Sequence, residues 1–182
     1  MKFAALLATA ASLAYAEVIK GQHTFDFGVH LMWETDTEAE TFTLTSAQAD
    51  KSYFGVILGS ESMSNTDCIM FLANGASSKA VDYHSSNFGV SPTPDVSNDV
   101  TSTLIDNSDG IVIMKAVRKL DTKDAKDFVI PGGDKWELGY AYNPSYSGTI
   151  MKHTRAGEIY INANGIFVTL GASFALVLAA LF

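Results

Sequence analysis

The middle of this chain is divided into short apolar or alternating runs, about ten residues apart, that are separated by clusters of turn residues. Residues 40–45 (ETFTLT) alternate between polar and apolar, whereas residues 53–58 (YFGVIL) and 68–72 (CIMFL) are continuously apolar. Alternation indicates a strand with one buried face, and short continuous runs are typical of buried strands. No long segment repeats apolar residues at helical spacing, so we predict an all-β fold.

The connections between these runs narrow the fold further. Residues 101–117 predict a β-hairpin around the turn 107–110 (NSDG), and residues 85–99, with two prolines among many Ser and Asn residues, predict a loop. Residues 45–51 (TSAQADK) predict a helical turn or a loop. Short antiparallel strands at this spacing favour an immunoglobulin-like β-sandwich, in which two facing sheets bury their apolar positions in one core.

The N-terminus has the composition of a targeting segment. Residues 1–16 begin with Lys2, continue through an apolar run and close on Ala14-Tyr15-Ala16, the small-x-small pattern of a cleavage site. The apolar run is shorter than the roughly 20 residues of a membrane span. We therefore predict a secretory signal peptide and a β-sandwich domain that covers residues 17–161.

The C-terminal segment, residues 162–182, predicts attachment to a membrane. Residues 166–182 are apolar and uncharged, and they lack the polar face of a core helix. One interpretation is a glycolipid-anchor (GPI) signal cut near residues 162–165, and the other is a retained tail anchor or single span. Small residues at the cut site favour the lipid anchor, and the missing polar spacer counts against it. In both cases we expect the domain on the extracellular side of a membrane, at the cell surface.

Charge and cysteine content exclude several classes of protein. Without Lys2, eleven basic side chains face twenty acidic ones, so we expect no nucleic acid or anionic lipid as partner. Cys68 is the only cysteine, so no intramolecular disulfide can form.

The chain contains no GxGxxG, P-loop, HExxH, GxSxG or CxxC motif, and no CxxCH motif for covalent attachment of haem.

One methionine stands in an unusual setting. Met63 lies among small polar residues with loop chemistry, in the stretch 60–67 (SESMSNTD), although methionine usually fills apolar space. Considered alone, it would cap a small apolar patch or lie exposed. The methionines Met32, Met70 and Met114 lie in strand-like runs, and we expect them in the core.

The order of several short elements resembles that of a DOMON domain, the extracellular β-sandwich of cellobiose-dehydrogenase cytochromes and of plant membrane-anchored b-type cytochromes. The resemblance extends over residues 28–161, nearly the whole predicted domain. Its elements in chain order are Trp33, the aromatic-glycine strand at 53–59, Met63 and Asp67 as M-x-x-x-D, the strand at 81–83, Arg118 to Asp127 as R-x-L-x-T-x-D-x-x-D, residues 138–142 and His153.

This resemblance implies a cofactor. In the haem-binding members, a methionine and a histidine at two of these positions ligate one b-type haem at the end of the sandwich. Carried over, Met63 and His153 are the axial ligands of a non-covalent haem b. Phe88 and Val90, which flank Gly89 in the polar 85–99 loop, are the residues that we expect near such a ligand. Such an iron has no free site for oxygen chemistry. The resemblance therefore implies a one-electron carrier that meets separate redox partners or small-molecule reductants, without substrate turnover of its own.

Alternatives remain open for individual residues. His23, His30 and His84 compete with His153 as ligand, and His84 is the strongest competitor because it follows a strand and precedes a loop. Arg118 would either contact a haem propionate or tie a loop to the sheet through charged hydrogen bonds.

The function itself also has alternatives. Some DOMON domains resemble carbohydrate-binding modules, so a haem-free module that binds carbohydrate, or a surface interaction protein, stays possible. Asp67 and Asp82 are better interpreted as turn or strand-end carboxylates than as a catalytic acid–base pair.

Overall fold

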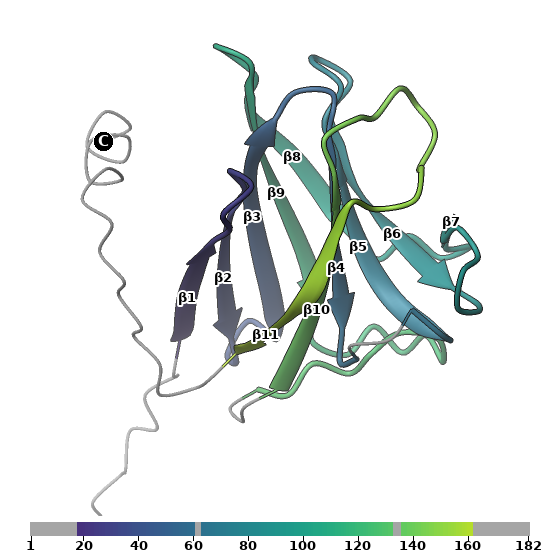
Figure 1. Ribbon diagram of the computed structural model, residues 1–182. Helices are drawn as coiled ribbons and strands as arrows, with labels where there is room; N and C mark the ends of the chain where they lie inside the picture. The colour runs from purple at the N-terminus through teal and green to yellow at the C-terminus, as the bar shows by residue number, and fades with distance from the viewer. Residues whose placement is uncertain (1–17, 61–62, 133–135, 162–182) are drawn as a thin grey trace, which may run out of the picture.

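Two antiparallel sheets face each other in the computed structural model of the protein, which describes residues 18–60, 63–132 and 136–161 (Figure 1). The five-stranded sheet has the order β1-β2-β3-β9-β8, and the six-stranded sheet has the order β11-β10-β4-β5-β6-β7. The strands of the first sheet are β1 (Val18–Thr24), β2 (His30–Asp36), β3 (Thr41–Ala49), β9 (Ile111–Lys119) and β8 (Thr101–Asp106). Those of the second are β11 (Arg155–Ile161), β10 (Trp136–Asn143), β4 (Tyr53–Leu58), β5 (Thr66–Leu72), β6 (Lys79–Ser85) and β7 (Thr93–Pro94). The predicted all-β sandwich is confirmed.

The predicted signal peptide at residues 1–16 and the predicted anchor segment at 162–182 lie outside the described residues. Within the part of the chain that the structure describes, no helix has the length and hydropathy that a bilayer span requires.

The main core fills the space between the two sheets. Phe42 and Leu44, which alternate with threonines in β3, are almost fully buried. They belong to one continuous cluster with Phe54 and Phe71 of the six-stranded sheet. Burial of each such side chain contributes about 1.5–3 kcal/mol, so this interior accounts for the association of the sheets.

A second apolar cluster lies on the outer face of the six-stranded sheet. Every residue of β4 and β5 is buried, whereas β2 and β9 alternate between buried and partly exposed positions. An outer face of this composition needs a cover. Part of that cover is the connection from β10 to β11, the yellow-green loop in Figure 1. The cluster consists of Tyr53, Ile57, Cys68, Met70 and Leu72, with Met63, Val81, Tyr83, Tyr146 and Ile150 packed against it.

Two local features differ from the sequence predictions. The sequence of residues 18–24 does not predict a strand, yet these residues form β1 and pair along the whole of β2. Ile19 is the only buried residue of β1, so the strand has no buried face that would produce an alternating pattern. The prediction of a helical turn or loop at 45–51 is wrong, because β3 continues to Ala49. Gln48 is fully buried there, and its Nε2 donates a hydrogen bond to Ser52 Oγ at 3.0 Å, so a polar residue occupies a strand position inside the fold.

Candidate functional site

A pocket of about 510 Å³ opens on the outer face of the six-stranded sheet. This volume falls in the range of small-molecule and cofactor sites, roughly 300–1,000 Å³. Its floor is formed by β4 and β5 through Tyr53, Gly55, Ile57, Cys68 and Met70. Its walls come from Met63, residues 88–92, Tyr140, Ala141, residues 150–153, Ala156 and Gly157.

Met63 and His153 reach this pocket from opposite ends of β4. Asn143 at the end of β10 pairs with Tyr53, so the loop that carries His153 starts at the Tyr53 end of β4. Met63 follows Leu58, at the other end of the same strand. Five strand steps separate the two ends by roughly 17 Å. Because both residues line one pocket, the two loops fold toward each other across the sheet. The site therefore lies on a sheet face, and the expectation of a site at the end of the sandwich is corrected.

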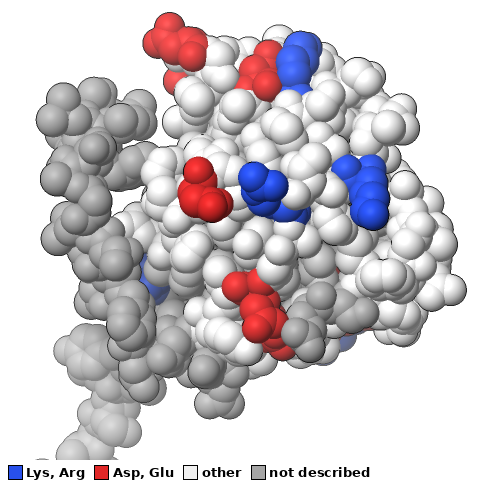
Figure 2. All heavy atoms as spheres, viewed as in Figure 1, with Lys and Arg blue, Asp and Glu red and all other residues white. Residues whose placement is uncertain are grey.

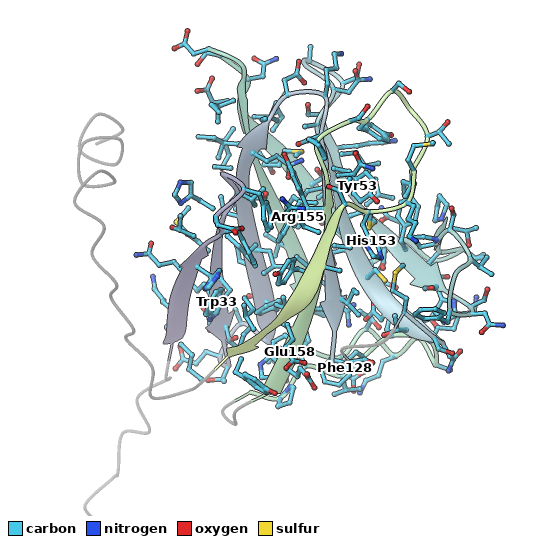
Figure 3. All side chains as sticks on the ribbon, in the orientation of Figure 1. Trp33, Tyr53, Phe128, His153, Arg155 and Glu158 are labelled. Carbon is cyan, nitrogen blue, oxygen red and sulfur yellow. The ribbon has the colours of Figure 1, made fainter. Side chains whose placement is uncertain are left out.

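Hydrogen bonds hold the loop that carries His153. The hydroxyl of Tyr53 donates to the backbone carbonyl of Met151 at 2.5 Å, and Asn143 Nδ2 donates to the carbonyl of Lys152 at 2.6 Å. Burial raises the pKa of Tyr53 to about 12, so this hydroxyl keeps its proton and remains a donor at neutral pH. Tyr53 and His153, both labelled in Figure 3, line the same pocket. The two residues that precede His153 are thus tied to strands of the sheet.

The backbone at Met63 is held from β6. The buried hydroxyl of Ser85 donates a hydrogen bond to the carbonyl oxygen of Met63 at 2.5 Å. Ser85 is the last residue of β6 and pairs with Thr66 at the start of β5. The Met63 side chain is partly buried and packs on the outer-face cluster. A methionine in a polar loop is therefore directed onto an apolar surface and into the pocket wall.

The histidines that compete with His153 lie elsewhere. All four histidines are among the described residues, and only His153 lines the pocket. His23 and His30 belong to β1 and β2 of the other sheet. His84 pairs with Asp67 in the β5–β6 ladder and does not contribute to the pocket lining.

Phe88 lies in the pocket wall, although most of its side chain faces solvent. It is 81% exposed, and Val90 beside it is 49% exposed. These residues leave an apolar rim along one side of the pocket. The opposite rim includes Met151, which is 59% exposed.

Several pocket residues were missed by the sequence reasoning. Cys68 and Gly55 line the floor, and their only signal was the continuous apolar composition of the two runs that contain them. Burial raises the pKa of the Cys68 thiol, so it is protonated at neutral pH. A Cβ atom at Gly55 would lie 2.7 Å from Met70 Sδ, so a larger residue would displace the floor of the pocket.

Arg118 lies outside the pocket, and its predicted contact with a cofactor is corrected. Its side chain is fully buried inside the sandwich, where Nη1 donates to Asp67 Oδ2 at 2.5 Å and Nη2 donates to the carbonyl of Phe128 at 2.5 Å. Asp67 Oδ2 also accepts a hydrogen bond from the backbone N–H of Phe128 at 2.8 Å. The guanidinium therefore ties the segment after β9 to β5, which is the structural alternative.

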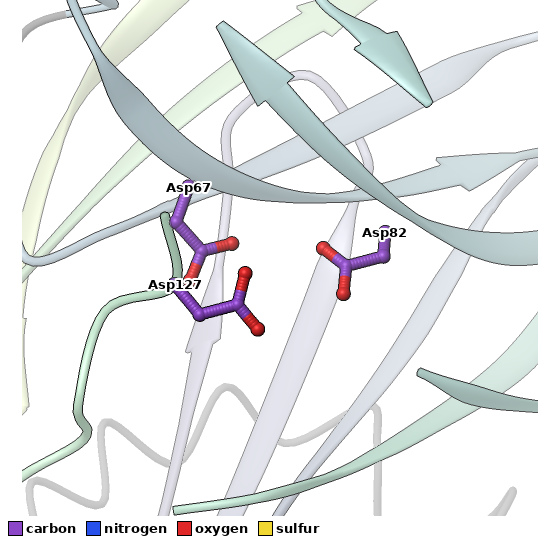
Figure 4. Close-up of side chains that lie close together, drawn as sticks. All are labelled: Asp67, Asp82 and Asp127. Carbon is purple, nitrogen blue, oxygen red and sulfur yellow. The ribbon is translucent and has the colours of Figure 1, made fainter. Parts of the chain in front are cut away.

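Three carboxylates surround this arginine. Side-chain oxygens of Asp67, Asp82 and Asp127 all lie within 4.8 Å of one another, and Figure 4 shows them converging from separate segments. Burial raises the pKa of each, that of Asp82 to about 7. Arg118 already supplies a cation at Asp67, so we interpret the group as a buried ion network. None of these residues lines the pocket, so the network does not form a catalytic acid–base pair there.

Charges are scattered over the molecular surface. On the face shown in Figure 2, small groups of charged side chains lie among wide uncharged areas, some acidic groups lie next to basic ones, and there is no single acidic patch. The negative net charge is therefore no sign of a concentrated binding surface on this face.

Comparisons with known proteins agree with this fold. The family model described as DOMON domain matches residues 26–143, a range that ends before His153. No curated protein is significantly similar to the chain in sequence. The cytochrome b domain of pyranose dehydrogenase from Coprinopsis cinerea superposes with a TM-score of 0.64 at 12% identity, covering 76% of this chain and 79% of that chain. The cytochrome domain of Myriococcum thermophilum cellobiose dehydrogenase has a TM-score of 0.54 at 13% identity, covering 80% and 89% respectively. At these identities the likeness shows a shared fold.

Proposed function

The chain belongs to the DOMON domain family, as its sequence pattern indicated, and from this premise we propose that it binds one non-covalent b-type haem and carries single electrons. One observation carries the proposal: Met63 and His153, ninety positions apart in the sequence, line the same apolar pocket from opposite ends of β4. The similar solved structures are cytochrome domains, which supports the assignment.

The residues of the pocket fit such a group. A thioether and an imidazole are a known pair of axial ligands for haem iron. Small residues at Gly55, Ala141 and Gly157 leave space over the sheet for a flat macrocycle. When bound, a haem supplies a one-electron couple, and thioether–imidazole ligation raises its reduction potential.

Each part of the chain has a distinct task in this proposal. Met63 and His153 would hold the iron of a bound haem from the two loops, and we propose a carrier without turnover of its own. Tyr53 and Asn143 hold the histidine loop in place through the carbonyls of the two residues before His153. The apolar floor would exclude water from a bound haem, and this would also favour its reduced state.

The cellular setting is a further part of the proposal. We propose that the domain lies on the extracellular side of a membrane, held by a C-terminal lipid anchor or a single span, and exchanges electrons with separate redox partners or small-molecule reductants. The composition of residues 1–16 and 166–182 supports this setting. Release of the protein from membranes by a phosphatidylinositol-specific phospholipase would distinguish the lipid anchor from a span.

Reconstitution with hemin tests the cofactor. We expect the full-length protein in detergent to bind one equivalent and to show a sharp Soret band with low-spin α and β bands after reduction. Met63→Ala and His153→Ala should each abolish the six-coordinate low-spin spectrum. Met32→Ala and His84→Ala, at positions outside the pocket, serve as matched controls and should retain it.

One observation favours a second function, carbohydrate binding without haem. Phe88 presents an exposed aromatic ring at the pocket rim, as sugar-stacking residues do. This second function would be supported if the wild-type protein stays colourless with hemin but binds glycans, and if Phe88→Ala abolishes glycan binding. The electron-carrier proposal would then be wrong.

A further inference from the structure

The described lining of the pocket contains a single basic side chain. Among the described residues that line it, Lys152 is the only lysine or arginine, and no aspartate or glutamate is present. Lys152 is also exposed, and a lysine in such a place can lay its aliphatic stem on apolar surface while its ammonium group stays in water. An apolar pocket with a single cation at its edge is suited to a flat apolar ligand that carries an anionic substituent.

We propose that Lys152 pairs with the propionate carboxylates of the cofactor and thereby sets which edge of the porphyrin faces solvent. This inference rests on the proposed function, because it concerns the same pocket. The role is the one that the sequence suggested for Arg118, whose guanidinium is bound to Asp67 inside the sandwich.

The position of Lys152 is determined by the same contacts that hold the histidine loop. Its backbone carbonyl accepts a hydrogen bond from Asn143 Nδ2 at 2.6 Å, and the carbonyl of Met151 accepts one from Tyr53. The lysine therefore has a fixed backbone and directly precedes His153. Only its side chain has to adjust to reach a carboxylate at the rim.

The lining also explains why the carboxylates belong at the rim. A carboxylate turned toward the floor would meet Ile57, Met70 and the protonated thiol of Cys68. A buried carboxylate without a partner is strongly unfavourable. The apolar edge of the porphyrin therefore covers the floor, and the acidic edge stays next to Lys152 and water.

A nearby cation provides a matched control. Arg155 lies two residues after His153 and is exposed, but it does not line the pocket. Its Nη1 donates a hydrogen bond to the carbonyl of Thr154 at 3.2 Å. Replacement of Arg155 changes the net charge as replacement of Lys152 does, without removing a cation from the pocket rim.

The test compares two ligands that differ only in charge. Hemin carries both propionates, and hemin dimethyl ester has the same ring with the carboxylates neutralised. We expect Lys152→Ala to weaken hemin binding about 2- to 5-fold, as for an exposed ion pair, and Lys152→Glu to weaken it by about tenfold. Neither change should alter the affinity for the ester. The low-spin spectrum of bound hemin should stay the same, because both axial ligands remain.

Control variants distinguish a failure of the proposed role of Lys152 from a failure of the haem proposal. Lys152→Arg should restore hemin affinity, and Arg155→Ala and Arg155→Glu should leave the ratio of the two affinities at its wild-type value. The dependence of hemin affinity on salt should decrease in Lys152→Ala. Equal losses for hemin and the ester, or unchanged hemin affinity in Lys152→Glu, would overturn the role of Lys152 alone. Failure of the wild type to bind either ligand would overturn the haem proposal and this inference together.

Discussion

The hydroxyl of Tyr53 donates a hydrogen bond to the backbone carbonyl of Met151, ninety-eight positions later in the sequence. Tyr53 begins β4 under the pocket, and Met151 lies two residues before His153. This single bond couples the strand that forms the floor to the loop that carries one of the proposed ligands.

Tyr53→Phe should loosen the histidine loop without removing the aromatic ring from the floor. We expect the free energy of unfolding to fall by about 0.5–1.5 kcal/mol, the contribution of one hydrogen bond. Amide hydrogen exchange in residues 150–154 should become faster. Tyr83→Phe is the control, because Tyr83 packs on the same cluster but does not line the pocket. Unchanged exchange in Tyr53→Phe would show that other contacts hold the loop.

Ser85→Ala should act on the other proposed ligand. Loss of the hydroxyl leaves the carbonyl of Met63 without this donor and frees the loop between β4 and β5. We expect a loss of about 0.5–1.5 kcal/mol in stability and, in hemin-loaded protein, a partial high-spin signal as methionine ligation weakens. Ser46→Ala removes a comparable buried hydrogen bond, to Gln48, in the other sheet. It should reduce stability without a change in spin state, and the same spectrum in both variants would contradict the role of Ser85.

Arg118→Met should damage the fold more than the cofactor site. Removal of the guanidinium leaves Asp67 buried beside Asp82 and Asp127 without a counter-charge. Breaking a buried ion pair in this way costs about 3–5 kcal/mol. Denaturation with urea should show the loss, and the fraction that remains folded should keep the hemin spectrum of the wild type. A variant that is as stable as the wild type but has an altered hemin spectrum would instead indicate that Arg118 acts at the cofactor site.

The buried acidic network predicts how stability depends on pH. Burial, followed by the charges of Asp67 and Asp127, raises the pKa of Asp82 from 3.8 to about 7. The folded protein therefore holds a proton that the unfolded chain releases between these values. This contribution to stability is complete below about pH 4 and is lost as the pH rises through about 7.

Asp82→Asn tests this dependence because asparagine resembles the protonated acid. We expect the wild type to lose about 1–4 kcal/mol of unfolding free energy between pH 4 and pH 8, and the variant to show a flatter profile and greater stability at pH 8. The accepted hydrogen bond from the N–H of Asp99 can be kept by the amide oxygen. Asp109→Asn, in the exposed turn between β8 and β9, is the control for the loss of one carboxylate. Parallel profiles for wild type and Asp82→Asn would contradict the raised pKa.

The sequence by itself determined the strands that have a strong local pattern. The alternation at 40–45, the apolar runs of β4 and β5 and the turn at 107–110 each depend on neighbouring residues, because side chains alternate between faces with a period of two. β1 was not predictable in this way, since one buried residue gives no period and the strand depends on pairing with β2. The continuation of β3 to Ala49 likewise depends on buried partners for Gln48 that come from Ser52 and Phe71.

Tertiary structure alone decided which distant residues meet. The sequence pattern proposed Met63 and His153 through a family resemblance, but the antiparallel register of β10 on β4 is what starts their loops at opposite ends of one strand. The same pattern did not show that Arg118 lies away from the pocket, because only the tertiary structure places β9 in the five-stranded sheet and the pocket on the outer face of the six-stranded sheet. Strand content follows from local alternation, whereas the pocket follows from long-range pairing, which no local pattern contains.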